Sequence, residues 1–303
     1  MTGARLQIHE VGLRDGLQME HETVPTEIKL RWLTALAATG IDIIQVGSFV
    51  HPTRVPQMAD TDAMFRQLTT SGQLPAGVIL SGLVLNEKGL ARGLACGVQM
   101  FCMGVSASET HSTKNTGMTI ADATERIIAT ARQALDAQCT VQVSVQSAFG
   151  CGFEGPVPEE RVLGIVRRYL DAGLTNISLA DTAGHAAPDA VERLFLAVRA
   201  MDASAELTCH FHNTYGMALA NCIAALRAGV TSFESSVAGL GGCPFTKVAG
   251  GNACTEDLVH MLQRMGLRTD VRLDGIIAVA QEIAGHFHRE MSGMVYRTGS
   301  IAR

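Results

Sequence analysis

The 303-residue sequence lacks the features that mark membrane-bound, nucleic-acid-binding or secreted proteins. It has no apolar run long enough to span a bilayer, and no basic tract interleaved with aromatic residues. Its formal net charge is −5. We therefore expect neither a membrane nor a nucleic acid as a partner. The N-terminal segment also lacks the charged head and apolar centre of a signal peptide.

The eight cysteines are scattered along the chain and form no Cys-x-x-Cys pair. This spacing argues against a disulfide framework or a structural zinc site, and it favours a reducing, cytoplasmic location. No proline-rich linker, low-complexity block or change in composition divides the chain. We therefore predict a single domain over residues 1–303, ending in a short mobile tail at about 291–303.

Eight short, mostly apolar runs alternate with helix-like segments, a pattern typical of a (β/α)₈ TIM barrel. The expected strands cover residues 5–12, 41–48, 77–85, 97–105, 140–148, 176–182, 206–212 and 231–237. The clearest helix-like segments cover residues 25–40, 121–138, 158–173, 187–201 and 215–229. In such barrels the chemistry lies at the C-terminal ends of the strands. The glycine-rich segment 237–259 after the eighth strand is predicted to form a lid loop.

The tripeptide His-Phe-His occurs twice, at residues 210–212 and 286–288. Residues two apart in a strand point to the same side, so His210 and His212 can face one ion at the end of the seventh strand. Unrelated hydrogen bonds are the alternative for this pair. The second copy follows a helix-like segment, where positions two apart lie about 200° apart around the axis. We interpret His286 and His288 as a solvated helix end.

Other strand ends supply further ligand types. Arg14 and Asp15 lie in the Gly-Leu-Arg-Asp-Gly turn after the first strand, where a surface salt bridge is the alternative. Asn252 follows the glycine-rich loop, where a helix N-cap is the alternative. Together with the histidine pair, Asp15 and Asn252 make a nitrogen and oxygen donor set. Such a set suits Mg²⁺ or Mn²⁺, with Co²⁺ or Zn²⁺ as alternatives.

Two further residues are candidates for moving protons. Cys243 lies between Gly242 and Pro244, where it has little to pack against, so we interpret it as a proton-donating thiol rather than a core cysteine. Asp181 ends the sixth strand. It is a candidate acid, base or orienting carboxylate, with a helix N-cap as the alternative.

Several segments together resemble the motifs of the 3-hydroxy-3-methylglutaryl-CoA (HMG-CoA) lyase family of metal-dependent barrels. They are EVGLRDGLQ, SFVHPTRVPQMAD, SLADTAG, HFHNTYGMALAN and SSVAGLGGCPFTKVAGGNACTEDLVHML, in order from about residue 5 to 265. The resemblance implies retro-Claisen-type cleavage of a 3-hydroxyacyl-CoA to acetyl-CoA and a keto acid. It places the metal ligands on Asp15, His210, His212 and Asn252.

The same resemblance implies roles for further residues. The enolate-stabilising arginine falls on Arg14 and the lid cysteine on Cys243. The general base stays open between His210 and Asp181. The candidates for binding the acyl-CoA substrate are Gln18, Gln45, Ser48, Thr182, Lys114 and Glu256. Among them, Lys114 is a candidate for contacting the CoA phosphates, with a solvated lysine as the alternative.

Three positions depart from the usual pattern of the family. Gln45 replaces a glutamate, Asn213 an aspartate, and Met19 an asparagine. An amide cannot act as a base or repel an anion, so we predict an altered choice of substrate, such as a citramalyl-CoA-like or bulkier 3-hydroxyacyl-CoA. The alternatives to a lyase are a Claisen-condensing 2-hydroxy-acid synthase, which lacks the cysteine loop, and a degenerate, non-catalytic barrel. A homodimer is expected on base rates.

Overall fold

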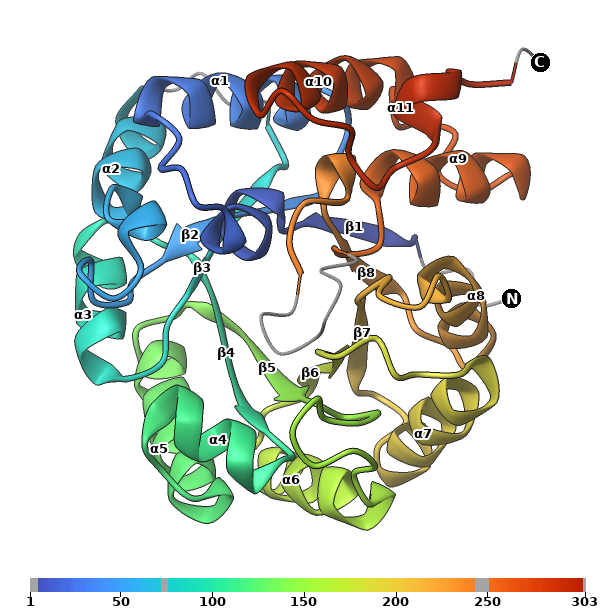
Figure 1. The fold of residues 1–303 in the computed structure, drawn as a ribbon. Helices are drawn as coiled ribbons and strands as arrows, with labels where there is room; N and C mark the ends of the chain where they lie inside the picture. The colour runs from blue at the N-terminus through green and yellow to red at the C-terminus, as the bar shows by residue number, and fades with distance from the viewer. Residues whose placement is uncertain (1–4, 72–75, 243–250, 302–303) are drawn as a thin grey trace.

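The computed structural model describes residues 5–71, 76–242 and 251–301. Eight parallel strands close into a barrel in the order in which they occur in the chain, and helices surround it (Figure 1). The strands are β1 (Gln7–Glu10), β2 (Ile43–Ser48), β3 (Ile79–Leu83), β4 (Met100–Ser106), β5 (Thr140–Gln146), β6 (Asn176–Asp181), β7 (Glu206–Phe211) and β8 (Ser232–Ser235). The predicted (β/α)₈ barrel is confirmed, because each expected run overlaps one of these strands.

The helices form the outer ring of the barrel (Figure 1). They are α1 (Thr26–Ala37), α2 (Thr61–Ser71), α3 (Glu87–Ala95), α4 (Glu109–Thr116), α5 (Ile120–Asp136), α6 (Glu159–Asp171), α7 (Pro188–Met201), α8 (Ala218–Arg227), α9 (Thr255–Arg264), α10 (Leu273–His286) and α11 (Val295–Thr298). The five helix-like segments correspond to α1, α5, α6, α7 and α8. Within the described residues, no helix has the length and apolar character needed to cross a membrane.

The main hydrophobic core lies between the strands and the surrounding helices. Large side chains that point out of the barrel or inward from the helices are fully buried there, including Trp32, Tyr169, Phe195 and Phe233. Tyr169 of α6 also donates its hydroxyl to the carbonyl oxygen of Ser144 on β5, over 3.1 Å. The barrel framework is therefore rigid enough to hold groups at the strand ends in fixed positions.

The C-terminal segment, whose mobility stays a prediction, makes contacts with the rest of the barrel. Met291, Val295 and Tyr296 are buried, and the backbone N–H of Met291 donates to the Tyr296 hydroxyl over 2.9 Å. Ser292 donates its hydroxyl to the carbonyl oxygen of Gly239, over 3.1 Å. The segment packs because its apolar residues cover the turn after β8, a contact that the short sequence pattern does not reveal.

The second His-Phe-His copy does not form an ion site in the structure. His286 is the last residue of α10 and packs edge-on against Trp32, with ring centroids 5.4 Å apart. His288 lies beyond the helix, exposed to solvent. The expected helix end is therefore found, although His286 is half-buried rather than fully solvated.

Candidate metal centre and active site

The turn after β1 presents Arg14 and Asp15 at the mouth of the barrel. The backbone N–H of Asp15 donates to the carbonyl oxygen of Val11 over 2.8 Å, which forms a tight helical turn over Gly12–Gly16. Glycine is required at position 12, because a Cβ atom there would lie 2.6 Å from the Oε1 atom of Glu10. That same oxygen accepts the N–H of Gly12 over 2.7 Å. The buried Glu10 carboxylate therefore fixes the shape of the turn.

Two imidazoles from the end of β7 meet the Asp15 carboxylate. The Nε2 atoms of His210 and His212 lie 3.1 Å apart. They lie 3.9 Å and 3.5 Å, respectively, from the Oδ2 atom of Asp15. Among the residues that the structure describes, this is the one group of three or more His, Cys, Asp or Glu side chains whose ligand atoms lie within 4.8 Å of one another. The sequence prediction that these three residues converge is confirmed.

The charges around Asp15 keep its carboxylate ionised. Burial would raise its pKa, but the Arg14 guanidinium, a hydrogen bond with His212 and the charge of His210 outweigh burial, and the pKa lies well below its usual value. Arg14 donates to Asp15 Oδ1 from one terminal nitrogen and to the side-chain oxygen of Gln45 from Nε. Gln18 donates to the same Asp15 oxygen over 3.2 Å. The second oxygen, Oδ2, faces the two imidazoles.

Asn252, which follows Gly250 and Gly251 in the sequence, also contacts this cluster. An isolated antiparallel bridge pairs it with His212, and its Nδ2 atom donates to Asp15 Oδ2 over 2.8 Å. Nδ2 also donates to the carbonyl oxygen of Leu240 over 3.0 Å. The Oδ1 atom of Asn252 is buried and accepts no hydrogen bond within the described part of the chain. Its role as a fourth metal ligand stays a prediction, which requires the amide to turn.

The donor set fits a divalent cation. Two imidazole nitrogens and a carboxylate oxygen point at one small space, and a buried amide oxygen without a partner lies next to them. Two neutral Nε2 lone pairs facing each other over 3.1 Å repel unless a proton or an ion lies between them. This combination of nitrogen and oxygen ligands suits Mg²⁺, Mn²⁺, Co²⁺ or Zn²⁺.

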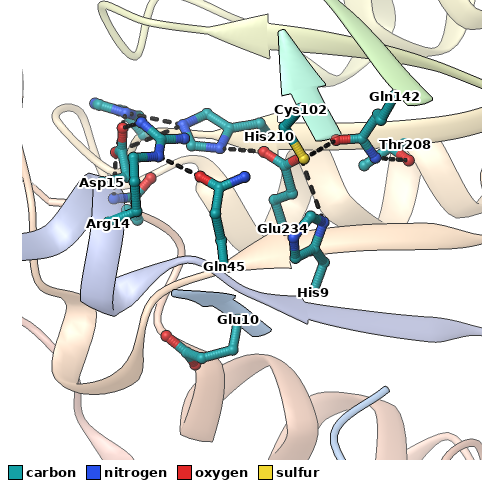
Figure 2. Close-up of polar contacts among 12 residues, drawn as sticks. His9, Glu10, Arg14, Asp15, Gln45, Cys102, Gln142, Thr208, His210 and Glu234 are labelled. Carbon is teal, nitrogen blue, oxygen red and sulfur yellow. Dashed lines mark hydrogen bonds and ion pairs between the residues drawn. The ribbon is translucent and has the colours of Figure 1, made fainter. Parts of the chain in front are cut away.

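Two buried residues beneath the cluster are missed by the sequence analysis. Glu234 of β8 accepts the Nδ1–H of His210 at its Oε2 atom over 2.8 Å. Its other oxygen lies 3.6 Å from Nδ1 of His9 on β1. Figure 2 shows His9, Glu234 and His210 in a row, whereas Glu10 points away from them. The strand register explains the row, because both His9 and His210 pair with Glu234 across neighbouring strands.

The protonation states of this row follow from its surroundings. Burial lowers the pKa of His9 to about 4, against the raising effect of Glu234, so His9 is neutral. Burial would lower the pKa of His210 as well, but the hydrogen bond and charge of Glu234 raise it overall. Burial would raise the pKa of Glu234, and the hydrogen bond with His210 outweighs that effect and lowers it. Glu234 is therefore an anion that is held by two imidazoles.

A cavity of about 350 Å³ opens above the cluster into the barrel mouth. Eight residues from the sequence analysis line it: Arg14, Asp15, Gln18, Gln45, Ser48, Thr182, His210 and His212. Apolar side chains also contribute to the lining, among them Met19, Val50, Val55, Leu83 and Leu85. The cavity thus combines charged groups with apolar surface.

Besides Asn252, whose place beside Asp15 is given above, three expected site residues do not line this cavity. Asp181 is fully buried, and its two carboxylate oxygens accept the backbone N–H groups of His185 and Ala186 over 2.8 and 2.9 Å. Glu256 lies at the first turn of α9, where its Oε2 atom accepts the N–H of Ala238 over 3.0 Å. Each carboxylate stabilises a backbone turn, which is why neither points at the cavity. The direct roles expected for Asp181 and Glu256 stay predictions.

The third residue, Lys114, lies on the exposed side of α4, with its ammonium 3.9 Å from the ring centroid of Phe153. His111 and Asn115 of the same helix line the cavity instead. They were missed because α4 is short and polar, which gives a weak helical pattern. Cys243 and the following residues 244–250 of the expected lid loop lie outside the described residues. Gly242 is the last described residue before them, and it lines the cavity.

Comparison with known proteins assigns this arrangement to a family. The family model described as HMGL-like matches residues 5–283 of the sequence. The chain belongs to the HMGL-like family. A relative from Bacillus subtilis, named hydroxymethylglutaryl-CoA lyase YngG, is 37% identical over 279 residues, which are 92% of each chain.

Another HMGL-like relative, from Pseudomonas aeruginosa, is named 3-hydroxy-3-isohexenylglutaryl-CoA/hydroxy-methylglutaryl-CoA lyase. It is also 37% identical, over 92% of both chains. Among solved structures, an HMG-CoA lyase from Acinetobacter baumannii in complex with coenzyme A and 3-methylmalate is 35% identical. It superposes with a TM-score of 0.91, over 99% of this chain and 97% of the other.

Proposed function

We propose that this HMGL-like protein is a divalent-metal-dependent carbon–carbon lyase. It cleaves an HMG-CoA-like 3-hydroxyacyl-CoA to acetyl-CoA and a keto acid. The observation that carries the proposal is the convergence of His210, His212 and Asp15 beside Arg14, at the mouth of a cavity. The relatives that share the family and most of their length with this chain are named as HMG-CoA lyases.

Different residues of the chain would bind the cation and stabilise the negative charge that forms on the substrate. Asp15, His210 and His212 would hold Mg²⁺ or Mn²⁺, with Asn252 as a fourth ligand. A bound cation supplies a Lewis acid that lowers the pKa of the substrate's 3-hydroxyl group. Arg14 lines the cavity and is held in place by Asp15 and Gln45. It is therefore placed to stabilise the negative charge on the thioester oxygen.

The bond between C2 and C3 of the acyl chain breaks as the 3-hydroxyl gives its proton to a general base, for which His210 and Asp181 are the candidates. The electron pair of that bond passes to C2, which leaves a keto acid and a thioester enolate, and protonation of C2 completes acetyl-CoA. A preorganised cation at the enolate oxygen is typically worth a few kcal/mol (~3) of transition-state stabilisation. Cys243 is the proposed donor of the proton to C2, on the strength of its motif alone.

The structure bears on the open question of the general base. Nδ1 of His210 donates to Glu234, and Nε2 points at Asp15 and His212. Neither nitrogen has a lone pair left for the substrate once Nε2 holds an ion. Both oxygens of Asp181 accept backbone N–H groups. Either group could take the hydroxyl proton only by giving up one of these contacts, so the choice of base stays open between His210 and Asp181.

A coupled assay for acetyl-CoA tests the proposal. The purified protein should release acetyl-CoA from HMG-CoA with Mg²⁺ or Mn²⁺ and lose this activity after chelation. Cys243→Ala should cripple a lyase, whereas it should leave a Claisen-condensing synthase intact. The proposal is wrong if no 3-hydroxyacyl-CoA is cleaved by metal-loaded protein, or if acetyl-CoA and a keto acid condense at a rate that Cys243→Ala does not change.

A bulkier substrate is the second candidate, and the apolar part of the cavity lining favours it. Met19, Val50, Val55, Leu83 and Leu85 offer hydrocarbon surface that a longer acyl substituent could contact. The relative whose name includes 3-hydroxy-3-isohexenylglutaryl-CoA is as similar to this chain as the one named only for HMG-CoA. Comparing kcat/KM for the two thioesters separates the candidates, and Leu85→Phe should selectively penalise the longer one.

A further inference from the structure

Glu234 is a buried charge that the proposed chemistry does not use. It lies on β8 inside the barrel, 7% exposed, directly beneath the candidate metal cluster. An anion in such a place is costly unless it is paired and hydrogen-bonded. The structure shows what pairs it: one oxygen contacts His210 of β7 and the other approaches His9 of β1. Figure 2 shows all three side chains in one row.

The contact with His210 decides which nitrogen faces the metal. The Oε2 atom of Glu234 lies 2.8 Å from Nδ1 of His210. An ionised carboxylate only accepts hydrogen bonds, so Nδ1 must carry the proton. The unprotonated nitrogen of the neutral ring is then Nε2, which is the atom that points at Asp15 and His212. The ring is thereby fixed in both its tautomer and its orientation.

The other side of the carboxylate is anchored as well. Nδ1 of His9 lies 3.6 Å from Oε1 of Glu234, and Nε2 of His9 lies 2.9 Å from the hydroxyl oxygen of Ser81 on β3. His9 and Ser81 are both fully buried. Four strands therefore contribute to one row, Ser81–His9–Glu234–His210. A side chain that is held from both sides has little freedom to swing away from His210.

We infer that Glu234 is a positioning residue that holds His210 with Nε2 toward the cation, and that His9 and Ser81 support it from behind. The inference rests on the proposed metal-dependent function. Carboxylates that hold the second nitrogen of a metal-binding imidazole typically account for about 10- to 100-fold in metal affinity. Among the described residues, His212 makes no hydrogen bond through its Nδ1 atom, so the two histidines are supported unequally.

The test measures Mn²⁺ binding to the full-length protein by titration calorimetry and by electron paramagnetic resonance. Glu234→Gln removes the charge at constant size, and Glu234→Asp keeps the charge but draws it back from His210. Both variants should bind Mn²⁺ about 10- to 100-fold more weakly than the wild type. Tyr169→Phe is the matched control. It deletes another buried, hydrogen-bonded polar group and should bind Mn²⁺ like the wild type.

Nitrogen-15 spectra of histidine-labelled protein give a readout that does not depend on activity. In the wild type His210 should show a protonated Nδ1, and in Glu234→Gln it should lose this single tautomer. If both Glu234 variants keep wild-type Mn²⁺ affinity, the inference is wrong. If Glu234→Gln does not fold, the Mn²⁺ affinity of Glu234→Asp tests the inference. A carboxylate with only a structural role would leave the Mn²⁺ affinity of this variant unchanged. If the wild type itself binds no Mn²⁺ or Mg²⁺, the proposed function fails first.

Discussion

Replacing Glu10 by glutamine should remove part of the pH dependence of stability. Glu10 is fully buried at the end of β1. Burial raises its pKa from 4.5 to about 7, against the opposing hydrogen bonds from Thr255, Val237 and Gly12. The site therefore resists ionisation in the folded protein but not in the unfolded chain. Between these two pKa values the folded state binds more protons than the unfolded state.

The sign and size of the effect follow from this difference. Unfolding releases a proton from Glu10 in this range, so the free energy of unfolding falls as the pH rises from 4.5 toward 7. At about 1.4 kcal/mol per pKa unit, the full effect is ~3 kcal/mol. Most of it, about 2.5 kcal/mol, falls between pH 5 and pH 8.

Glutamine should fit the site because the hydroxyl of Thr255, which donates to Glu10, can instead accept a hydrogen bond from the amide. The Oε1 atom of Glu10 accepts the N–H groups of Gly12 and Val237, over 2.7 and 2.9 Å, and an amide oxygen can do the same. Oε2 accepts the hydroxyl of Thr255 over 2.6 Å. With an amide nitrogen there, that hydroxyl can turn to donate to Ser235, whose Oγ atom lies 2.8 Å away. The groups that contact Glu10 in the wild type then each keep a hydrogen-bond partner.

The assay is chemical denaturation of the wild type and Glu10→Gln from pH 5 to pH 8. The variant should gain about 2.5 kcal/mol relative to the wild type across this range. Taking the difference between the two proteins cancels every other titrating group. A difference that stays constant with pH would refute the reasoning, and one that falls as the pH rises would reverse its sign.

Four further changes test other parts of the structure. His212→Ala should abolish metal-dependent turnover and weaken Mn²⁺ binding by ~100-fold or more, measured by calorimetry. Gly104→Ala should destabilise the protein by ~2 kcal/mol or more, because the new Cβ would meet the Ser144 carbonyl oxygen at 2.6 Å. Gly164→Ala in α6 meets nothing within 4 Å and should instead add up to about 1 kcal/mol. Gln45→Glu should shift kcat/KM toward HMG-CoA relative to a bulkier thioester, measured with both substrates.

Most of the barrel could be predicted because its strands are buried on both faces. Such strands give short apolar runs that stand out against the amphipathic helices. Two of the helices that were not predicted have sequences with little helical pattern. α3 contains two glycines in EKGLARGLA, and α4 reads ETHSTKNT, with hardly an apolar residue. Tertiary packing rather than propensity holds these helices in place.

Some residues of the candidate site could be predicted from the sequence, and others could not. Asp15, His210 and His212 were predicted because they follow strands, where barrels place their chemistry. Glu234 was not, since its meaning depends on the register that aligns it with His9 and His210. Asp181 also follows a strand, but its carboxylate accepts backbone N–H groups of the next turn. Position at a strand end therefore indicates where a group lies, and only its partners show what it does.

The sequence of β5 alternates between apolar and polar residues, and this alternation indicates that the strand borders the cavity. Counting apolar residues alone does not reveal it. The strand reads TVQVSVQ, with buried valines facing the helices and Gln142, Ser144 and Gln146 lining the cavity. Polar groups inside a barrel are costly unless they are hydrogen-bonded. Gln142 meets this requirement by donating to the hydroxyl of Thr208 over 3.0 Å. Strict alternation in a parallel barrel strand, where both faces are normally apolar, thus predicts which strand borders a polar site.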